Sequence, residues 1–416
     1  MIKLNGTVTD GNNFFENTDP FDLIAEYGSP LYVYNERLLR ENCRLLKNFC
    51  PYPQFQLHYS VKANANLSLL RIIREEGLRV DAMSPGEIVV EQAAGFSSGE
   101  ILFVSNNISD TEMQFVHDKG ILMSVDSVSQ LERYATLFPD SEIFIRFNTG
   151  IGAGHHEKVV TGGKNTKFGV TPDAIPAVKD ILRRYNIRLK GINQHIGSLF
   201  LEKSPYMESV ESIFEIARQF DDLDFIDFGG GFGVPYHKQE GQGALDFCDM
   251  GQALAAAMKN FSNEYGKQLT YVIEPGRFVV CEAGVLIGTV HAIKENHGTK
   301  YVGTDLGLNT LMRPAMYDAF HDVEVYRATE DVSAAYEAVT ITGNICETGD
   351  ILAKNRLMPE IFENDLICVL DAGAYGYSMA SNYTCRLRPA EYLITGERGR
   401  LIRRRDTFDD ILAAYV

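Results

Sequence analysis

A regular alternation of strand-like and helix-like segments over residues 55–274 constrains the fold of this chain more than any other feature. Short runs that are apolar or alternate in polarity predict strands, and stretches with helical periodicity, such as 85–94 and 127–137, separate most of them. Strands that alternate with helices form parallel sheets, and eight of them can close a (β/α)8 TIM-like barrel. The predicted strands lie near residues 55–63, 79–83, 101–104, 121–126, 143–147, 189–195, 224–228 and 270–274.

An open doubly wound sheet is the structural alternative, because it is built from the same alternating segments. The first strand-turn-helix unit lacks the G-x-G-x-x-G sequence of dinucleotide-binding folds. This weakens a dinucleotide-binding interpretation and favours the barrel.

Beyond Arg277 the pattern changes to successive strand-like runs joined by Gly-rich turns, which is typical of an antiparallel β domain. We therefore predict a barrel over residues 31–279. Residues 280–416, together with 1–30, are predicted to form a β domain of the sandwich or barrel-like kind. Its predicted strands include Val285–Ile293, Ala338–Thr342, Leu366–Leu370 and Glu391–Ile394.

Charge and cysteine content limit the possible partners and compartment. The chain of 416 residues has 39 Lys and Arg against 56 Asp and Glu, a formal net charge of −17, which argues against nucleic acid or an anionic membrane as a partner. No apolar run reaches the length of a membrane span, and residues 1–6 do not open a signal peptide. The seven cysteines are scattered without a C-x-x-C pair, so we expect reduced thiols in the cytoplasm and neither a disulfide framework nor a metal site.

Lys62 follows the first predicted barrel strand, just before an Asn-containing turn. We expect a lysine at the carboxyl end of a buried strand to lose water, which disfavours its charged form. Its free amine can then attack a carbonyl and form a Schiff base. Taken alone, such a lysine is more often one that extends to solvent.

Other unusual residues also follow predicted strands. The active site of a (β/α)8 barrel lies at the carboxyl ends of its strands, so residues just after the strands should gather there. Four sequence features directly follow predicted strands, as this rule requires: Lys62, His195-Ile196-Gly197-Ser198, Gly229-Gly230-Gly231-Phe232-Gly233 and Glu274-Pro275-Gly276-Arg277.

Together these signals describe a pyridoxal phosphate site. A glycine run lets backbone N–H groups approach an anion, and TIM barrels commonly hold a phosphate near strands seven and eight. The Glu274 carboxylate would keep the pyridine nitrogen protonated, and His195 could lie against the ring face. Each signal alone has a simpler explanation, because glycine runs form turns and a lone histidine is usually structural.

These motifs resemble those of the fold-type III pyridoxal-phosphate-dependent decarboxylases, which share the alanine racemase-like fold. The resemblance covers about residue 20 to the end and is closest to the branch of this family that acts on diaminopimelate. The further motifs that carry it are Gly152-Ala153-Gly154-His155-His156, Lys167-Phe168-Gly169, Arg313-Pro314-Ala315-Met316-Tyr317, Cys346-Glu347-Thr348-Gly349-Asp350 and Ala374-Tyr375-Gly376-Tyr377.

The resemblance implies a role for each motif. Lys62 would hold pyridoxal 5′-phosphate as a Schiff base, with His195, Glu274 and Arg277 also at the cofactor. The phosphate would be held by Ser198, Gly230, Gly231, Gly276 and Tyr375. The carboxylate at the far end of the substrate would be bound by Arg277, Arg313 and Tyr317, with Tyr375 nearby. Glu347 would accept the distal ammonium, and Cys346 would protonate the carbanion left after carbon dioxide departs. In this family Cys346 and Glu347 reach the partner subunit's site, so a homodimer with shared sites is implied.

The implied reaction removes carbon dioxide from the D-configured centre of meso-2,6-diaminopimelate and gives L-lysine. The close alternative is a sister decarboxylase of D-ornithine, D-lysine, carboxynorspermidine or a basic L-amino acid, although these substrates would leave Arg277 and Arg313 without a distal carboxylate to pair. A non-catalytic homologue would be expected to lose Lys62, Cys346 or the phosphate glycines. A racemase of similar barrel architecture is also possible, but it would require a basic residue facing Lys62 rather than the Cys346-Glu347 loop.

Some positions leave other interpretations open. Arg313 and Tyr317 are four residues apart and could form a helix-surface pair, and a single cysteine is usually an inert hydrophobe. Leu199, Pro85 and the segment 104–108 depart from the residues usual in the family, and the changes at Leu199 and Ile108, near the expected rim, bear on substrate fit. The loop over residues 150–167, which contains His155 and His156, is rich in turn residues and is predicted to be mobile.

Overall fold

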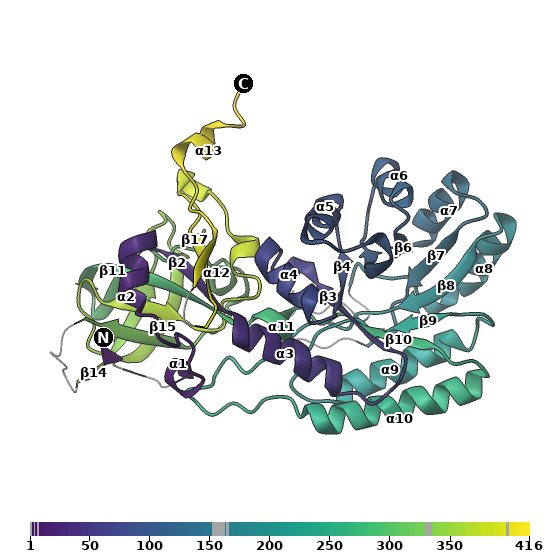
Figure 1. Cartoon of the computed structure of the whole chain (residues 1–416), viewed down its shortest axis with the longest axis horizontal. Helices are drawn as coiled ribbons and strands as arrows, with labels where there is room; N and C mark the ends of the chain where they lie inside the picture. The colour runs from purple at the N-terminus through teal and green to yellow at the C-terminus, as the bar shows by residue number, and fades with distance from the viewer. Residues whose placement is uncertain are drawn as a thin grey trace. The chain divides into compact units, whose positions relative to one another are not determined.

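The computed structural model describes residues 2–3, 5, 8–151, 163, 166–328, 335–396 and 399–416. They form two compact units, shown in Figure 1. The barrel unit comprises residues 42–234 and 244–279, and the sheet unit comprises residues 1–41, 235–243 and 280–416.

The barrel unit contains a closed barrel of parallel strands, which confirms the predicted (β/α)8 barrel and excludes the open doubly wound sheet. All eight predicted runs form barrel strands. The strands are β3 (Phe55–Ser60), β4 (Arg79–Ala82), β5 (Ile101–Val104), β6 (Leu122–Val125), β7 (Glu142–Arg146), β8 (Arg188–Asn193), β9 (Phe225–Asp227) and β10 (Thr270–Ile273). Because β10 pairs with both β9 and β3, the four strands β8, β9, β10 and β3 are consecutive around the barrel.

The helices between the strands lie around the barrel in Figure 1. They are α4 (Leu67–Glu75), α5 (Pro85–Ala94), α6 (Asp110–Asp118), α7 (Val128–Leu137), α8 (Ile175–Arg184), α9 (Ser204–Ala217) and α10 (Phe247–Tyr265). Helix α3 (Glu36–Asn48) precedes β3, and α11 (Arg277–Val280) follows β10. Serine side chains define several starts, because a serine oxygen at the N-cap satisfies a free N–H of the first turn. Ser84 accepts from the Glu87 N–H, and Ser109 forms a capping box with Glu112. Pro85 occupies the first turn of α5, a position that suits proline.

The barrel interior is layered. An apolar layer is formed by the side chains of Leu102, Val104, Phe144, Phe225 and Val272. Side chains two residues further along a strand point to the same face. Polar residues at the carboxyl ends of the strands therefore form a second layer above the apolar one, next to the site described below.

The sheet unit holds, among the described residues, a ten-stranded sheet. Its strands are β1 (Ile2–Lys3), β2 (Leu31–Asn35), β11 (Gly284–Asn296), β12 (Thr299–Thr304), β13 (Val323–Arg327), β14 (Tyr336–Thr342), β15 (Ile351–Pro359), β16 (Leu366–Val369), β17 (Ala390–Ile394) and β18 (Arg400–Arg403). Its helices are α1 (Val8–Gly11), α2 (Pro20–Tyr27), α12 (Arg313–Tyr317) and α13 (Phe408–Leu412). Most pairs are antiparallel, as predicted, but β12–β14 and β2–β17 are parallel.

The N-terminal boundary differs from the predicted one at residue 31. All five residues of β2 are buried, and the strand pairs with β11 and β17 of the sheet unit. Residues 31–41 therefore belong to the sheet unit, and a short segment at 235–243 joins it as well. Within the described part of the chain, no helix is long and apolar enough to cross a membrane.

Candidate active site

Four sequence motifs meet at one side of the barrel rim. Lys62 follows β3, the His195-to-Ser198 segment follows β8, the glycine run follows β9, and Glu274 to Arg277 follow β10. These are the four consecutive strands of the barrel, and electrostatic interactions link Lys62 to both His195 and Glu274. The predicted gathering of these motifs is therefore present in the structure.

Lys62 itself differs from the expectation drawn from the sequence. The strand β3 ends at Ser60, and Lys62 lies on the following 3-10 turn, Val61–Ala63. Val61 and Ala63 are buried, whereas the Lys62 side chain is exposed. The prediction of a buried lysine that has lost its water was wrong, because the side chain is exposed on the turn that follows the strand.

The glycine run has no room for side chains. A Cβ added to Gly230 would lie 2.0 Å from the carbonyl oxygen of Glu274. One added to Gly231, whose φ is +108°, would lie 2.5 Å from the carbonyl oxygen of Gly197. Gly276 is also tight, since its Cβ would lie 3.0 Å from Cβ of Ser60. These glycines therefore allow neighbouring segments of the rim to approach more closely than residues with side chains would.

A buried cation lies beside the glycine run. Arg277 is 5% exposed, and its Nη2 donates to Oγ of Ser198 at 3.0 Å. Leu199, one of the unusual positions, has a left-handed backbone with φ of +72°, and its N–H donates to the carbonyl oxygen of Gly231. Arg277, Ser198 and the glycines together form a cradle of suitable charge for a phosphate.

His195 is held in its neutral form. Its Nδ1 accepts from the backbone N–H of Gly230 at 3.0 Å, so Nε2 carries the ring proton. Burial lowers the pKa of His195 well below its usual value, and the nearby charges of Lys62 and Arg146 lower it further. A neutral ring can lie against an aromatic cofactor without adding a charge.

Glu274 is surrounded by ionisable residues that the sequence analysis did not single out. It is 5% exposed, and burial raises its pKa, while Asp227, Lys62, Arg146 and Asp81 oppose that rise. Asp81, Arg146 and Asp227 each lie at the end of a barrel strand with little or no exposure. Each is a charged residue at or next to the end of an apolar run, a pattern that fits a residue turning to solvent equally well.

In the sheet unit, Arg313 is buried rather than paired on a helix surface. Its Nη1 donates to Nε2 of His321 at 2.7 Å, and its guanidinium lies 4.6 Å from the centre of the Tyr236 ring. The Nδ1 of His321 donates to the carbonyl oxygen of Leu370, so His321 is neutral. Tyr317, at the end of the same short helix, is half-buried.

Cys346 and Glu347 are exposed on a loop of the sheet unit. The loop is held by Asp350, whose carboxylate accepts from the backbone N–H groups of Ile345 and Leu308. Tyr383 donates through its hydroxyl to Glu347. Cys346 lines a cavity of about 650 Å³ within the sheet unit.

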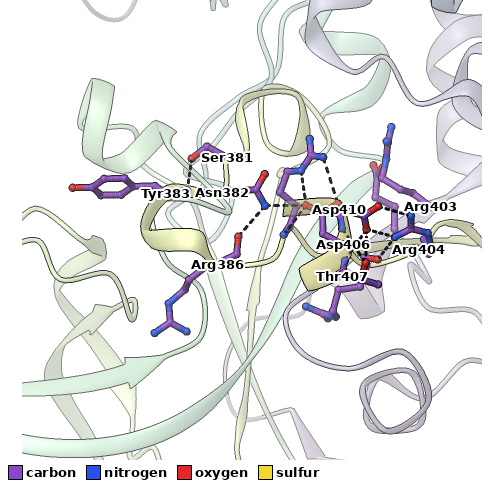
Figure 2. A network of polar contacts seen from close by, with 12 residues as sticks. Ser381, Asn382, Tyr383, Arg386, Arg403, Arg404, Asp406, Thr407 and Asp410 are labelled. Carbon is purple, nitrogen blue, oxygen red and sulfur yellow. Dashed lines mark hydrogen bonds and ion pairs between the residues drawn. The ribbon is translucent and has the colours of Figure 1, made fainter. Parts of the chain in front are cut away.

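A polar network connects the segment that carries Tyr383 to the C-terminal residues (Figure 2). Asn382 donates to Asp406 at 2.9 Å and to the carbonyl oxygen of Arg386. Arg386 in turn donates to the carbonyl oxygen of Asn344, next to the Cys346 loop. The loop is thus supported from the C-terminal side of the unit.

The remaining predicted site residues are Tyr375 and the two histidines of the loop over residues 150–167. Tyr375 is half-buried in the sheet unit and has a left-handed backbone with φ of +56°. His155 and His156 lie outside the described residues, as does most of the loop predicted to be mobile.

The chain is similar to known proteins over nearly its whole length. Residues 36–281 match the family described as "Pyridoxal-dependent decarboxylase, pyridoxal binding domain". The chain is 41% identical to the diaminopimelate decarboxylase of Methanothermobacter thermautotrophicus, with 97% of this chain and 95% of that protein covered. It is 34% identical to the diaminopimelate decarboxylase of Escherichia coli strain K12, with 94% of each covered.

Solved structures agree with this similarity. The crystal structure of diaminopimelate decarboxylase from M. jannaschii in complex with L-lysine matches with a TM-score of 0.86 at 31% identity, covering 96% of this chain and 95% of that one. A lysine/ornithine decarboxylase from Vibrio vulnificus matches with a TM-score of 0.77 at 21% identity, which shows a shared fold.

The fold and the rim site define a pyridoxal-phosphate-dependent decarboxylase of fold type III. The predicted family, fold and cofactor are thereby confirmed. Within that class, the chain belongs to the diaminopimelate decarboxylase family.

Proposed function

We propose that this chain decarboxylates meso-2,6-diaminopimelate at its D-configured centre and releases L-lysine. The observation that carries the proposal is the assembly of Lys62, the glycine run and buried Glu274 on neighbouring strand ends. The relatives named diaminopimelate decarboxylase support this choice of substrate, as does the related structure in complex with L-lysine.

The residues of the barrel unit fit pyridoxal 5′-phosphate. Gly230 and Gly231 have no side chains that could block access to their backbone N–H groups, and Arg277 with Ser198 supplies positive charge and a hydroxyl. The carboxyl group of Glu274 is 5% exposed at the rim, and its negative charge suits a protonated ring nitrogen. When bound, the cofactor supplies an electron sink for the electron pair left on the substrate as carbon dioxide departs.

The proposed roles of the rim residues follow from their surroundings. Exposed Lys62 is accessible to a carbonyl and would hold the cofactor covalently. Neutral His195 would lie against the ring, and Glu274 would keep the ring nitrogen protonated. The phosphate would be held by Ser198, Gly230, Gly231, Gly276, Arg277 and Tyr375.

The second half of the substrate calls for an anion clamp and an ammonium acceptor. Arg313 is held by neutral His321 and forms no ion pair with a carboxylate of the described residues, so its charge can pair with a distal carboxylate. Arg277, Tyr317 and Tyr375 would complete this clamp, and Glu347 would accept the distal ammonium. Cys346, an exposed thiol, would deliver the proton that replaces carbon dioxide.

We also propose a homodimer in the cytoplasm. Cys346 and Glu347 would act in the site of the partner subunit, as the family resemblance implies. All seven cysteines are free in the structure, which accords with a reducing compartment.

The function is tested by product analysis with a matched variant. Purified protein loaded with pyridoxal phosphate and supplied with meso-2,6-diaminopimelate should form L-lysine and no D-lysine. Lys62→Ala should abolish both the visible absorbance of the covalently held cofactor and lysine formation. The same substitution at exposed Lys259 on α10 should change neither. Absence of lysine with the fully loaded wild-type protein would contradict the proposed reaction.

A further inference from the structure

Three carboxyl groups share the polar layer inside the barrel. Asp227 ends β9 and Glu274 follows β10, and these parallel strands are neighbours with Asp227 paired to Val272. Phe225 and Val272 face the apolar layer of the barrel, so Asp227 and Glu274, each two residues further on, point into the barrel directly above it. Asp81 at the end of β4 joins them from the opposite side of β3.

These groups are removed from water. Asp81 and Asp227 are 0% exposed, and Glu274 is 5% exposed. Two cations interact with Glu274, namely Arg146 and Lys62, of which Lys62 is exposed. If all three carboxyl groups were ionised, their negative charge would exceed the positive charge of the nearby cations. Keeping that excess charge away from water would carry a large desolvation cost.

Hydrogen bonding points to protons on the aspartates. Oδ1 of Asp227 accepts from the Gly229 N–H at 2.8 Å, and the carboxyl groups of Asp227 and Glu274 lie within hydrogen-bonding reach of each other. Yet Oδ2 of Asp227 and Oε1 of Glu274 lack any donor among the described residues. Two carboxyl groups can be hydrogen-bonded to each other only when one of them carries a proton.

The surroundings of the two groups favour a proton on Asp227 over one on Glu274. Burial and the charges of Glu274 and Asp81 raise the pKa of Asp227 well above its usual value. Glu274 differs, because its hydrogen bonds with Asp227 and Asp81 and its attraction to Lys62 and Arg146 all oppose the rise that burial causes in its pKa. The other ionisable groups that interact with Asp227 are Arg146 and Tyr206.

We propose that Asp227 is a neutral carboxylic acid that donates its proton to Glu274, and that it thereby keeps Glu274 ionised and oriented toward the ring nitrogen of the cofactor. Asp227 is a positioning residue in this scheme, because it acts through Glu274. Its proton stays on Asp227 throughout, and no bond to substrate is made. The part of the inference that concerns the cofactor rests on the proposed function, whereas the protonation of Asp227 does not.

The substitution Asp227→Asn tests whether residue 227 acts as a neutral hydrogen-bond donor or as an ionised carboxylate. Asparagine has nearly the same shape, so its oxygen can accept from the Gly229 N–H and its amide can donate to Glu274. If Asp227 is neutral, Asp227→Asn should bind pyridoxal phosphate within about twofold of wild type, since it preserves both hydrogen bonds. Asp227→Ala, which has neither, should bind it at least about tenfold more weakly.

Proton counting provides a readout that does not depend on the reaction. A native acid that stays protonated at pH 7 ionises when the chain unfolds, so wild type should release about one proton more on unfolding than Asp227→Asn. Calorimetry in buffers of different ionisation enthalpy measures this difference. Asp173→Asn, the same change at an exposed carboxylate of the barrel unit, should leave proton release and cofactor binding unchanged.

Specific outcomes would overturn the inference. Equal proton release from wild type and Asp227→Asn would show that Asp227 is ionised, and cofactor binding as weak in Asp227→Asn as in Asp227→Ala would show that a neutral donor does not suffice. If the variants do not fold, wild type at pH 7 must still show the infrared band of a protonated carboxyl group, and its absence contradicts the inference. If wild type shows the expected difference in proton release but forms no lysine, the proposed reaction is rejected and the protonation of Asp227 is not.

Discussion

At the scale of single residues, two of the three predicted catalytic residues, Lys62 and Cys346, have exposed side chains on supported backbone, and the third, His195, is half-buried. Lys62 lies between buried Val61 and Ala63, and Cys346 lies on a loop fixed by Asp350. Exposed reactive groups on fixed backbone can reach a substrate while the supporting residues keep their position. The chemistry of the site therefore depends on residues that do not react.

The residue-scale prediction concerns Cys346. Cys346→Ala should retain the bound cofactor, because the cofactor residues lie elsewhere, but kcat should fall by on the order of 100-fold or more, the usual loss when a positioned proton donor is removed. Steady-state kinetics with meso-2,6-diaminopimelate measures the effect. Cys248→Ala, at an exposed thiol on α10, serves as the control. Turnover near the wild-type rate would remove Cys346 from the role of proton donor.

Single residues also mark the limit of what the sequence could predict. Glu274 was found because Pro275 and Gly276 follow it, whereas Asp81, Arg146 and Asp227 have no comparable neighbours that set them apart. An acid at the end of an apolar run reads equally well as a residue that turns to solvent. Only the closed barrel, which directs alternate side chains inward, buries these residues together.

At the scale of secondary structure elements, the glycine run after β9 is the element on which the cofactor site depends. Its close approaches are to backbone atoms, which cannot move aside as a flexible side chain can. The Cβ position of Gly230 is next to the carbonyl oxygen of Glu274, so a substitution at Gly230 would disturb both the glycine run and the segment that follows β10.

Gly230→Ala should therefore weaken binding of pyridoxal phosphate by at least about tenfold, because the added Cβ would lie 2.0 Å from the carbonyl oxygen of Glu274 and would force the two segments apart. Equilibrium titration followed by cofactor absorbance measures this. Gly99→Ala provides the matched control, since a Cβ at Gly99 meets nothing within 4 Å. Unchanged affinity in Gly230→Ala would mean that the glycine run does not contact the cofactor.

Elements with local signals were predictable, and long-range pairings were not. The eight barrel strands each carry an apolar run with a helix after it, and all were found. The parallel pairing of β2 with β17 joins residues more than 350 positions apart, so no local periodicity indicates it. The N-terminal domain boundary was misplaced for this reason, because Leu31–Asn35 reads the same in either domain.

At the scale of the whole molecule, the proposed site takes residues from two subunits. Mixing two inactive variants tests this point. Lys62→Ala and Cys346→Ala subunits, mixed in equal amounts and allowed to exchange, should recover about one quarter of wild-type activity. Half of the dimers would be mixed, and each mixed dimer would have one intact site. Each variant incubated alone is the control, and a mixture no more active than those controls would contradict a site shared between subunits.

The most direct test of the proposed reaction is to measure carbon dioxide released from a panel of substrates by the purified, cofactor-loaded protein. The panel holds meso-2,6-diaminopimelate, its L,L isomer, D-lysine, D-ornithine, L-lysine and L-ornithine. Release from the meso compound alone is the predicted result, because only this compound combines a D-configured reacting centre with a distal carboxylate for Arg313. Release from a diamine with one carboxylate, without release from the meso compound, would contradict the distal clamp and the proposed reaction.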